Sequence, residues 1–288
     1  MGWWIGMAIG LPVAFVVHEL GHWWLMEEAG FPPRRARLFL GPALLRFIWR
    51  NVPCEVGLLP VGAQVEADER LASEAGWWRN LLVYLAGPAA NLVLGLAGAA
   101  GLFGYQAWQA GHGPGMAALH AVAAAGRLLD GLIAGFGAMV VNFIPTLVMG
   151  LGPTGTGSLA AMGGALQQPF GWEDVAFGFV TVQLVLATFN LMPFPGLDGF
   201  GALACLYEGI TGRRVSPAVF AWGRDVLFLG LILGSTILAM GRSDAIHAAA
   251  MRIPEGYRIL TLNLLGLSIL LLLTALRSHL LRVRPRAR

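Results

Sequence analysis

The sequence predicts an all-α polytopic membrane protein, with about five to six transmembrane helices and a small membrane-associated β-hairpin after the first helix. Apolar residues make up 57% of the chain and charged residues 12%, about half of the ~25% usual in soluble domains. Several apolar runs approach the roughly 20 residues that a helix needs to cross a bilayer. All 19 basic residues are arginines, and most of them flank these runs, as topology signals do.

The apolar runs are expected to form helices, and the first of them spans about residues 3–26. It lacks the basic amino-terminal region of a signal peptide and is too long for one, so we interpret it as a retained span. After it, apolar and polar residues alternate with glycine and proline punctuation, which predicts a β-hairpin at about 36–66. Further apolar segments lie at about 80–103, 129–151, 175–195, 225–241 and 257–276.

Arginine placement predicts the orientation of the chain. The loop after the first span, the stretch around 213–224 and the C-terminal tail are rich in arginine, so we expect all three on the cytoplasmic side. The segment at 129–151 then cannot be a simple crossing. A membrane-surface or re-entrant helix is predicted there, with six full spans as the alternative. The stretch 104–128, rich in glycine and alanine, is predicted to be a short loop.

His18, Glu19 and His22 form the pattern H-E-x-x-H inside the first apolar run. Residues four apart lie on one face of a helix, so both imidazoles can bind a single zinc ion, with Glu19 beside them as a general base. Each ionisable group inside a membrane span costs at least a few kcal/mol. Three such groups together therefore indicate a metal site rather than coincidence.

Catalytic zinc keeps three protein ligands and one open position, so a third ligand must come from elsewhere in the chain. Asp198 is the best candidate, because it follows a span that Pro193 and Pro195 interrupt. Interrupted backbone is tolerated at depth only where it lines a cavity or is buried in protein. A turn residue at the end of a span is the alternative for Asp198. The rival carboxylates, which lie at span ends beside solvent, are Asp130, Glu173 and Asp174.

Four motifs, in this order over roughly residues 10–205, resemble the site-2 protease family of intramembrane zinc metalloproteases. The first is the H-E-x-x-H pattern, and the second, Leu59 to Val65, is similar to a strand of the family's β-hairpin. The third is the A-G-P-x-x-N run from Ala86 to Asn91, and the fourth is N-x-x-P-x-P-x-L-D-G from Asn190 to Gly199. Their combination is far more specific than H-E-x-x-H alone.

The resemblance implies one zinc ion per chain, held by His18, His22 and Asp198, with Glu19 as the catalytic base. The chemistry would be that of a zinc metalloendopeptidase.

The resemblance also implies how a substrate is held. The hairpin, with Val61 and Gly62, would offer an edge strand to an unwound substrate, and Asn190 would contact the substrate backbone near the scissile bond. Asn91 would bind substrate or support the site, with helix packing as the alternative.

The resemblance implies a catalytic membrane core over 1–206, followed by C-terminal transmembrane helices and a basic tail over 207–288. The chain would lie in the lipid bilayer of a bacterial inner membrane, with its active site toward the cytoplasm. Its partner would be the transmembrane helix of a single-span protein, such as an anti-sigma factor or a signal-peptide remnant. Nucleic acid is not an expected partner, because no basic face with interleaved aromatic residues is present.

Two departures from the family pattern and two alternatives accompany this interpretation. Residues 104–128 leave no room for the PDZ domains that many bacterial members carry, and Phe200 replaces the second glycine of the last motif. A metal-binding scaffold or pseudoprotease is the main alternative, although such a protein does not need Glu19. A transporter is the other, although no inverted repeat is apparent.

Overall fold

The computed structural model describes residues 2–150, 171–194 and 196–216 and a few isolated positions beyond them, with side chains up to residue 134 in the first range. One compact unit, Met1–Ala134 with Leu166–Val215, contains every contact discussed below. The spans predicted at 225–241 and 257–276 lie, apart from Tyr257, outside the described residues.

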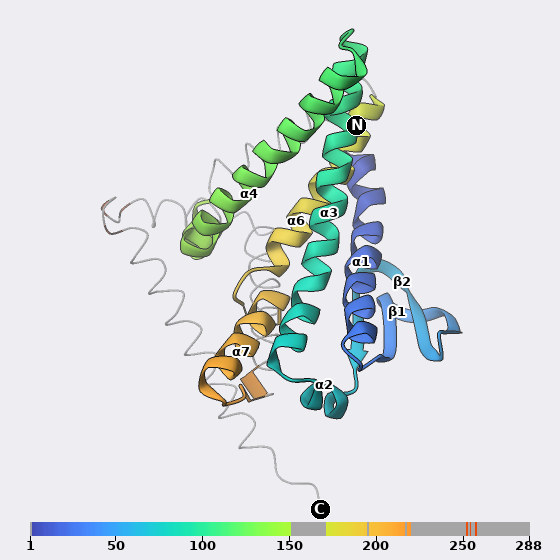
Figure 1. Ribbon diagram of the computed structural model, residues 1–288, viewed down its shortest axis with the longest axis vertical. Helices are drawn as coiled ribbons and strands as arrows, with labels where there is room; N and C mark the ends of the chain where they lie inside the picture. Colours follow the sequence, from blue (N-terminus) through green and yellow to red (C-terminus); the bar gives the residue numbers. More distant parts are fainter. Residues whose placement is uncertain are drawn as a thin grey trace, which may run out of the picture. The chain divides into compact units, whose positions relative to one another are not determined.

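The described elements are helices and one two-stranded sheet, which follows the first helix (Figure 1). In chain order they are α1 (Gly2–Glu28), β1 (Pro33–Trp49), β2 (Val52–Ala67), α2 (Glu69–Ala75), α3 (Trp77–Gln109), α4 (Pro114–Gly150), α6 (Trp172–Asn190) and α7 (Asp198–Thr211).

Four of the described helical segments are long and apolar enough to cross a membrane: α1, α3, the Pro114–Ala134 part of α4, and α6. The polytopic all-α fold with one small sheet after the first helix is therefore confirmed. Tryptophans mark both ends of α1, at Trp4 and Trp24. Twenty residues rise about 30 Å in a helix, which matches the hydrocarbon thickness between two aromatic belts.

α1, α3 and α6 pack against one another through small residues. α6 runs parallel to α1. A Cβ added at Gly6 of α1 would overlap the backbone of Val175, and one added at Gly10 would lie 3.1 Å from Cα of Phe179. α3 runs antiparallel to both helices (Figure 1). Its Gly95 lies against Leu184 of α6. Glycine lets helix backbones approach closely in a membrane, where van der Waals contact replaces the hydrophobic effect as the driving force.

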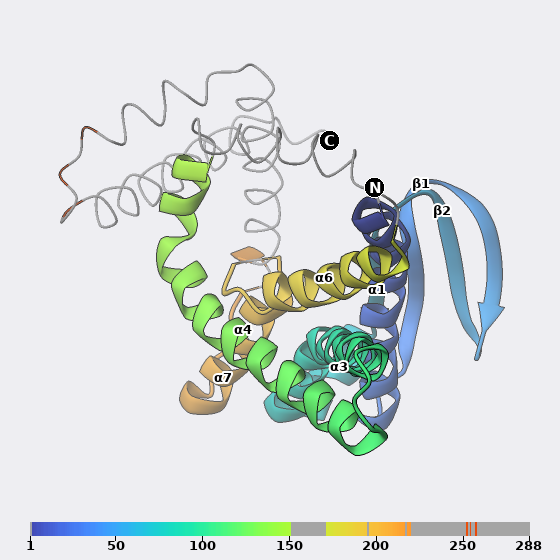
Figure 2. The ribbon, with the colours of Figure 1, turned by 90° about the horizontal axis from the view of Figure 1, so that it is seen from above.

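The predicted hairpin is confirmed and is wider than expected, since its two strands pair from Pro33↔Ala67 to Trp49↔Val52. Ala36 has two partners, Val65 on one side and Cys54 on the other. The first part of β1 therefore lies between two parts of β2, and both strands bend, as the curved ribbon in Figure 2 shows. The bends coincide with positive φ at Phe39 and Gly62.

The turn of the hairpin is attached to the end of α1. Arg50 and Asn51, both with positive φ, make the two-residue turn, as expected for a tight hairpin. The Arg50 guanidinium pairs with Glu27 of α1, and the rings of Trp23 and Trp49 lie 4.7 Å apart. The sheet is thus held beside the second half of α1, next to the H-E-x-x-H pattern.

The predicted loop at 104–128 is wrong. α3 continues to Gln109, α4 begins at Pro114, and only residues 110–113 connect them. Alanine is the best helix former, and proline at the first helical position is favourable, so the alanine-rich stretch after Pro114 starts a new helix. The segment 129–151 is, through Gly150, the second part of α4; that it does not cross the membrane stays a prediction.

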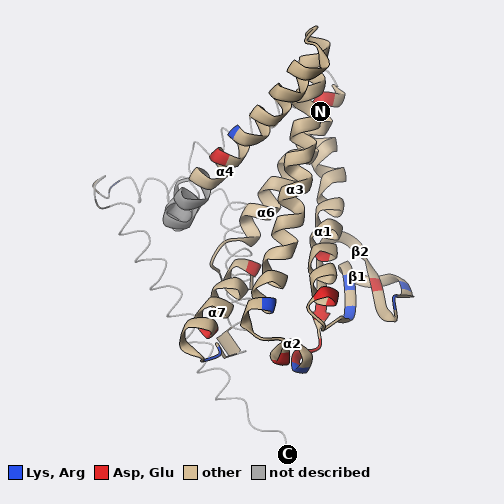
Figure 3. Cartoon of the chain, in the orientation of Figure 1, with Lys and Arg blue, Asp and Glu red and all other residues tan. Residues whose placement is uncertain are grey.

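Most charged residues among those described lie toward the end of the unit where α1 finishes (Figure 3). The exceptions are Glu19 within α1, Asp198 at the start of α7, Arg127 and Asp130 on α4, and Glu173 and Asp174 at the start of α6. This asymmetry distinguishes a charged end from an apolar end, and the H-E-x-x-H pattern lies in the part of α1 nearer the charged end.

Candidate metal centre

One face of α1 has a buried residue at every fourth position, and this face includes both packing glycines and the two histidines. The buried residues that share this spacing are Gly2, Gly6, Gly10, Ala14, His18 and His22. Positions i and i+4 lie one above the other on a helix. The face of α1 that packs against α6 through its first residues therefore presents two imidazoles toward α3 and α7 about two helical turns beyond Gly10.

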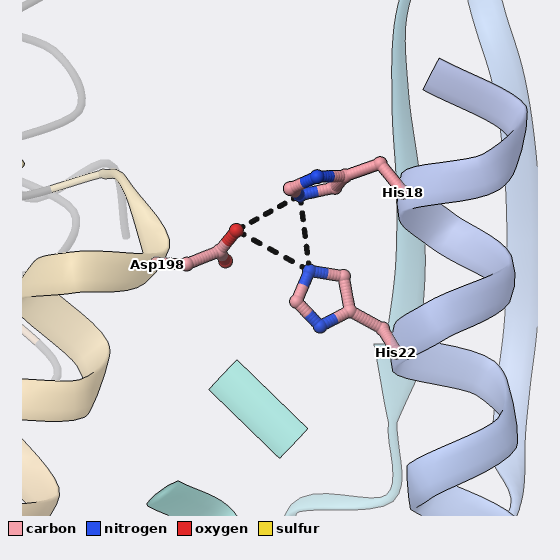
Figure 4. A group of neighbouring side chains, drawn as sticks. All are labelled: His18, His22 and Asp198. Atoms are coloured by element: carbon pink, nitrogen blue, oxygen red, sulfur yellow. Dashed lines mark hydrogen bonds and ion pairs between the residues drawn. The ribbon is translucent and has the colours of Figure 1, made fainter. Parts of the chain in front are cut away.

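Three ligand atoms converge from α1 and α7 (Figure 4). Nε2 of His18 lies 2.9 Å from Oδ2 of Asp198, and Nε2 of His22 lies 3.3 Å from the same oxygen. The two Nε2 atoms are 3.1 Å apart. Residues 180 positions apart in the sequence thus meet at one point, and within the described residues this is the one group of three or more His, Cys, Asp or Glu at metal-ligand spacing.

These distances fit a metal ion. Tetrahedral zinc with bonds of about 2.0–2.1 Å separates neighbouring ligand atoms by about 3.3–3.4 Å, close to the observed triangle. Nδ1 of His22 lies 2.7 Å from the carbonyl oxygen of Val83. Since that carbonyl can only accept, Nδ1 carries the hydrogen, and in the neutral ring Nε2 then points a lone pair at the carboxylate. A cation between these acceptors resolves their repulsion.

Gly87 of α3 leaves the space that the two imidazoles occupy. A Cβ at this position would overlap Nε2 of His22 and lie 2.7 Å from Nε2 of His18. On the other side of the contact, a Cβ at Gly21 would lie 2.5 Å from the carbonyl oxygen of Ala86. The two glycines bring α1 and α3 close enough for Val83 to reach His22.

The turn between α6 and α7 brings Asp198 level with the histidines. α6 ends at Asn190, and the next residues form a tight turn in which a Cβ at Gly199 would overlap the carbonyl oxygen of Leu191. Asp198 is the first residue of α7, a position where the helix dipole favours a carboxylate. The ring of Tyr84 on α3 packs against Gly201, one turn beyond Asp198, and fixes the start of α7.

Glu19 is buried beside this triangle without belonging to it, with 9% of its surface exposed. Its carboxylate interacts electrostatically with both histidines and with Asp198, and the backbone amide of Val65 in β2 contacts it as a hydrogen-bond donor. A buried carboxylate at the edge of a metal site is placed to take a proton from water there.

Of the remaining predicted residues, Asn91 contacts a histidine of the triangle, whereas Asn190, Val61 and Gly62 lie in other surroundings. Asn91 is fully buried and its amide nitrogen lies 3.3 Å from Nδ1 of His18, so it contacts a candidate ligand and not the surface. Asn190 donates from its amide to the carbonyl of Leu186 at the end of α6. Val61 is exposed in β2, beside the bend at Gly62.

The rival carboxylates do not join the site. Asp130 is exposed on α4, and Glu173 and Asp174 are exposed in the first turn of α6, which is the end opposite to the one that leads to Asp198.

Sequence reasoning missed two contributors, the carbonyl of Val83 and the ring of Tyr84. A signal for the first was available, because buried residues of α3 also recur every fourth position: Val83, Gly87, Asn91, Gly95 and Ala99. Two helices that each carry such a row, one with histidines and one with Gly87 and Asn91, are expected to face each other. No comparable pattern marks Tyr84.

Comparison with known families gives a match consistent with this geometry. The model of peptidase family M50 matches residues 6–234, most of the chain. The matched range contains both histidines, Glu19 and Asp198, and every described element from β1 to α7, together with α1 from Gly6 onward.

Proposed function

We propose a function for this chain on the premise that it belongs to peptidase family M50, the site-2 protease family. It is a zinc endopeptidase that cuts other membrane proteins in or near their transmembrane segments. Membership makes the chain an intramembrane metalloprotease in general terms.

The observation that carries the proposal is the triangle of His18, His22 and Asp198 between apolar helices, with Glu19 next to it. Nitrogen and oxygen ligands at tetrahedral spacing suit zinc, and three protein ligands leave one position open. When bound, zinc supplies a Lewis acid and a water of lowered pKa. Glu19 would take the proton of the attacking water and pass it to the leaving amine.

Burial of the site decides which groups can act. His22 is anchored through Nδ1 to Val83, so its ring cannot turn away from the centre. The surrounding helices exclude bulk water, which strengthens every electrostatic interaction at the reacting carbonyl. Glu19 lies on the same helix turn as both histidines, so no large motion is needed to bring the base to the reacting water.

The sheet supports a way to present the substrate. A peptide bond inside a transmembrane helix is protected by its own hydrogen bonds and must be unwound before cleavage. The last part of β2, residues 63–67, pairs with β1 on one side, and Val65 turns its amide toward Glu19 on the other. An unwound substrate adding beside it, past Val61 and Gly62, would recover its lost hydrogen bonds.

We assign Asn190 a role in binding the substrate backbone. The side chain of Asn190 lies at the end of α6, just before the turn that leads to Asp198. There its amide can bind the backbone of a strand held near the metal. The substrates we expect are single-span proteins already trimmed on the outer side, including anti-sigma factors and signal-peptide remnants.

The orientation we propose places the charged end of the unit in the cytoplasm of a bacterium, with the chain in the inner membrane. Arginine favours the cytoplasmic side, and the described charges gather where α1 ends. His22 is two residues from Trp24, about 3 Å along the helix axis. The site would lie inside the hydrocarbon boundary, yet within reach of water from that side.

The test compares the wild-type chain with Glu19→Gln in detergent or vesicles, using a transmembrane peptide as substrate. We expect about one zinc per chain in both proteins, and cleavage by the wild type alone, because the amide retains the shape of Glu19 and cannot accept a proton. Equal function of both proteins would favour a scaffold or a transporter. Wild-type cleavage restricted to soluble, unstructured peptides would refute the intramembrane part.

A further inference from the structure

The second nitrogen of each histidine ring has a different partner. Nδ1 of His22 donates to the backbone carbonyl of Val83 at 2.7 Å, which leaves Nε2 free to bind a metal. Nδ1 of His18 instead meets a side chain, the amide of Asn91, at 3.3 Å. A backbone carbonyl can only accept, whereas an amide side chain can accept or donate.

If His18 binds a metal, the Asn91 amide must accept a hydrogen bond from the ring and cannot donate one to it. Nε2 of His18 can bind a metal only through its lone pair, so in the neutral ring the hydrogen must be on Nδ1. That N–H is buried and needs an acceptor. Asn91 is fully buried, and among the described residues its amide oxygen has no hydrogen-bond partner. Rotating the amide by 180° places this oxygen at Nδ1 of His18 and breaks no bond of the oxygen.

We infer that Asn91 is a positioning residue, whose side-chain oxygen accepts the Nδ1 hydrogen of His18 and holds that ring with Nε2 toward the metal. The inference rests on the proposed function, because it assumes that His18 is a metal ligand. Asn91 does for His18 what the carbonyl of Val83 does for His22. Partners of this kind fix the ring orientation of a ligating histidine and raise its basicity.

A plain packing role predicts different behaviour. The matched control is Gln183 on α6, a second amide that is fully buried in the same bundle. Within the described part of the chain its oxygen also has no hydrogen-bond partner. Its nitrogen donates to Gly10 of α1 and to no histidine. If Asn91 only packs, replacing either amide by leucine should affect the protein in the same way.

The experiment measures metal affinity rather than cleavage. Full-length protein in detergent is titrated with Co²⁺, whose visible absorption reports tetrahedral coordination, and with Zn²⁺ in competition with a chelator. Wild type is compared with Asn91→Leu, Asn91→Asp and Gln183→Leu, and circular dichroism checks folding. Aspartate has the shape of asparagine and can only accept, so it separates accepting from donating.

We expect Asn91→Leu to raise the dissociation constant about 10- to 100-fold, as the loss of such a partner does. Asn91→Asp and Gln183→Leu should remain close to wild type. Wild-type affinity in Asn91→Leu would overturn the inference, and so would an equal loss in Asn91→Leu and Asn91→Asp. If the leucine variant does not fold, Asn91→Asp decides alone, since a weakened site there contradicts an accepting role.

Failure of the proposed function would look different. A wild-type chain that binds zinc and cuts no transmembrane peptide would refute the protease, while the ratio of metal affinities between the variants would still test Asn91.

Discussion

The apolar half of the helix bundle and the half nearer the charged end have the same close helix packing, but the packing serves different purposes in the two halves. In the apolar half, α1 meets α6 through Gly2, Gly6 and Gly10, and the buried polar side chain is Gln183. In the half nearer the charged end, the same face of α1 carries His18 and His22. Close helix approach sets stability in the first half and metal geometry in the second, so equal substitutions should have unequal consequences.

The largest effect is expected at Asp198→Ala, which removes the third ligand. Zinc affinity should fall by more than the 10- to 100-fold lost when only a partner of a ligand is removed, and cleavage should be abolished. Metal content of the purified protein and cleavage of a transmembrane peptide measure both effects. Asp130→Ala, an exposed carboxylate on α4, is the control and should retain zinc. Loss of zinc in both variants would contradict the assignment.

The comparison between halves is sharpest for two glycines of α3. Gly87→Ala forces a Cβ into the imidazoles of His18 and His22, so we expect at least a 10-fold loss of zinc affinity, the size caused by disturbing ligand orientation. Gly95→Ala meets the flexible side chain of Leu184, which can move, so its zinc affinity should stay near wild type.

Equilibrium metal titration of the two variants tests this pair, with thermal unfolding as the measure of stability. Equal zinc affinities in the two would show that α3 does not set the ligand geometry.

Overpacking the apolar half should affect stability before chemistry. In Gly6→Ala the added Cβ overlaps the backbone of Val175, and backbone cannot move aside as a side-chain tip can. We expect a loss of about 1–3 kcal/mol in stability and a smaller loss of zinc affinity than in Gly87→Ala. Thermal unfolding with and without zinc measures both. A greater loss of zinc affinity in Gly6→Ala would mean that the halves are not separable.

The smallest effect is expected at Gln183→Leu. With the residues that the structure describes, the Gln183 amide makes one long hydrogen bond of 3.4 Å, to Gly10, and its oxygen has no partner. Replacing an incompletely bonded buried group by an apolar one of similar shape is close to neutral or stabilising. Stability should change by less than about 1 kcal/mol, with zinc affinity unchanged. A strong destabilisation, seen in the same unfolding experiment, would indicate that this amide holds α1 and α6 together.

Most helices and the hairpin could be predicted because their signals are local. A long apolar run in a bilayer forms a helix, because the helix satisfies all of its own backbone hydrogen bonds. The alternation of apolar and polar residues over 36–66 has a period of two, which predicts strands. The loop predicted at 104–128 failed for a local reason as well. The alanines after Pro114 favour a helix more strongly than the glycines of the same stretch disfavour one.

Within the candidate site, the sequence determined which residue types could bind a metal and half of their geometry. Four-residue spacing in one helix places His18 and His22 together whatever the rest of the chain does. The sequence favoured Asp198 over Asp130, Glu173 and Asp174 but left a turn residue as its alternative. The tertiary structure decided that Asp198 meets the histidines, because that depends on the parallel course of α6 and the turn before α7. It also decided the orienting partners, Val83 and Asn91. A backbone carbonyl has no sequence signature, and an amide shows its role only through the neighbour it meets.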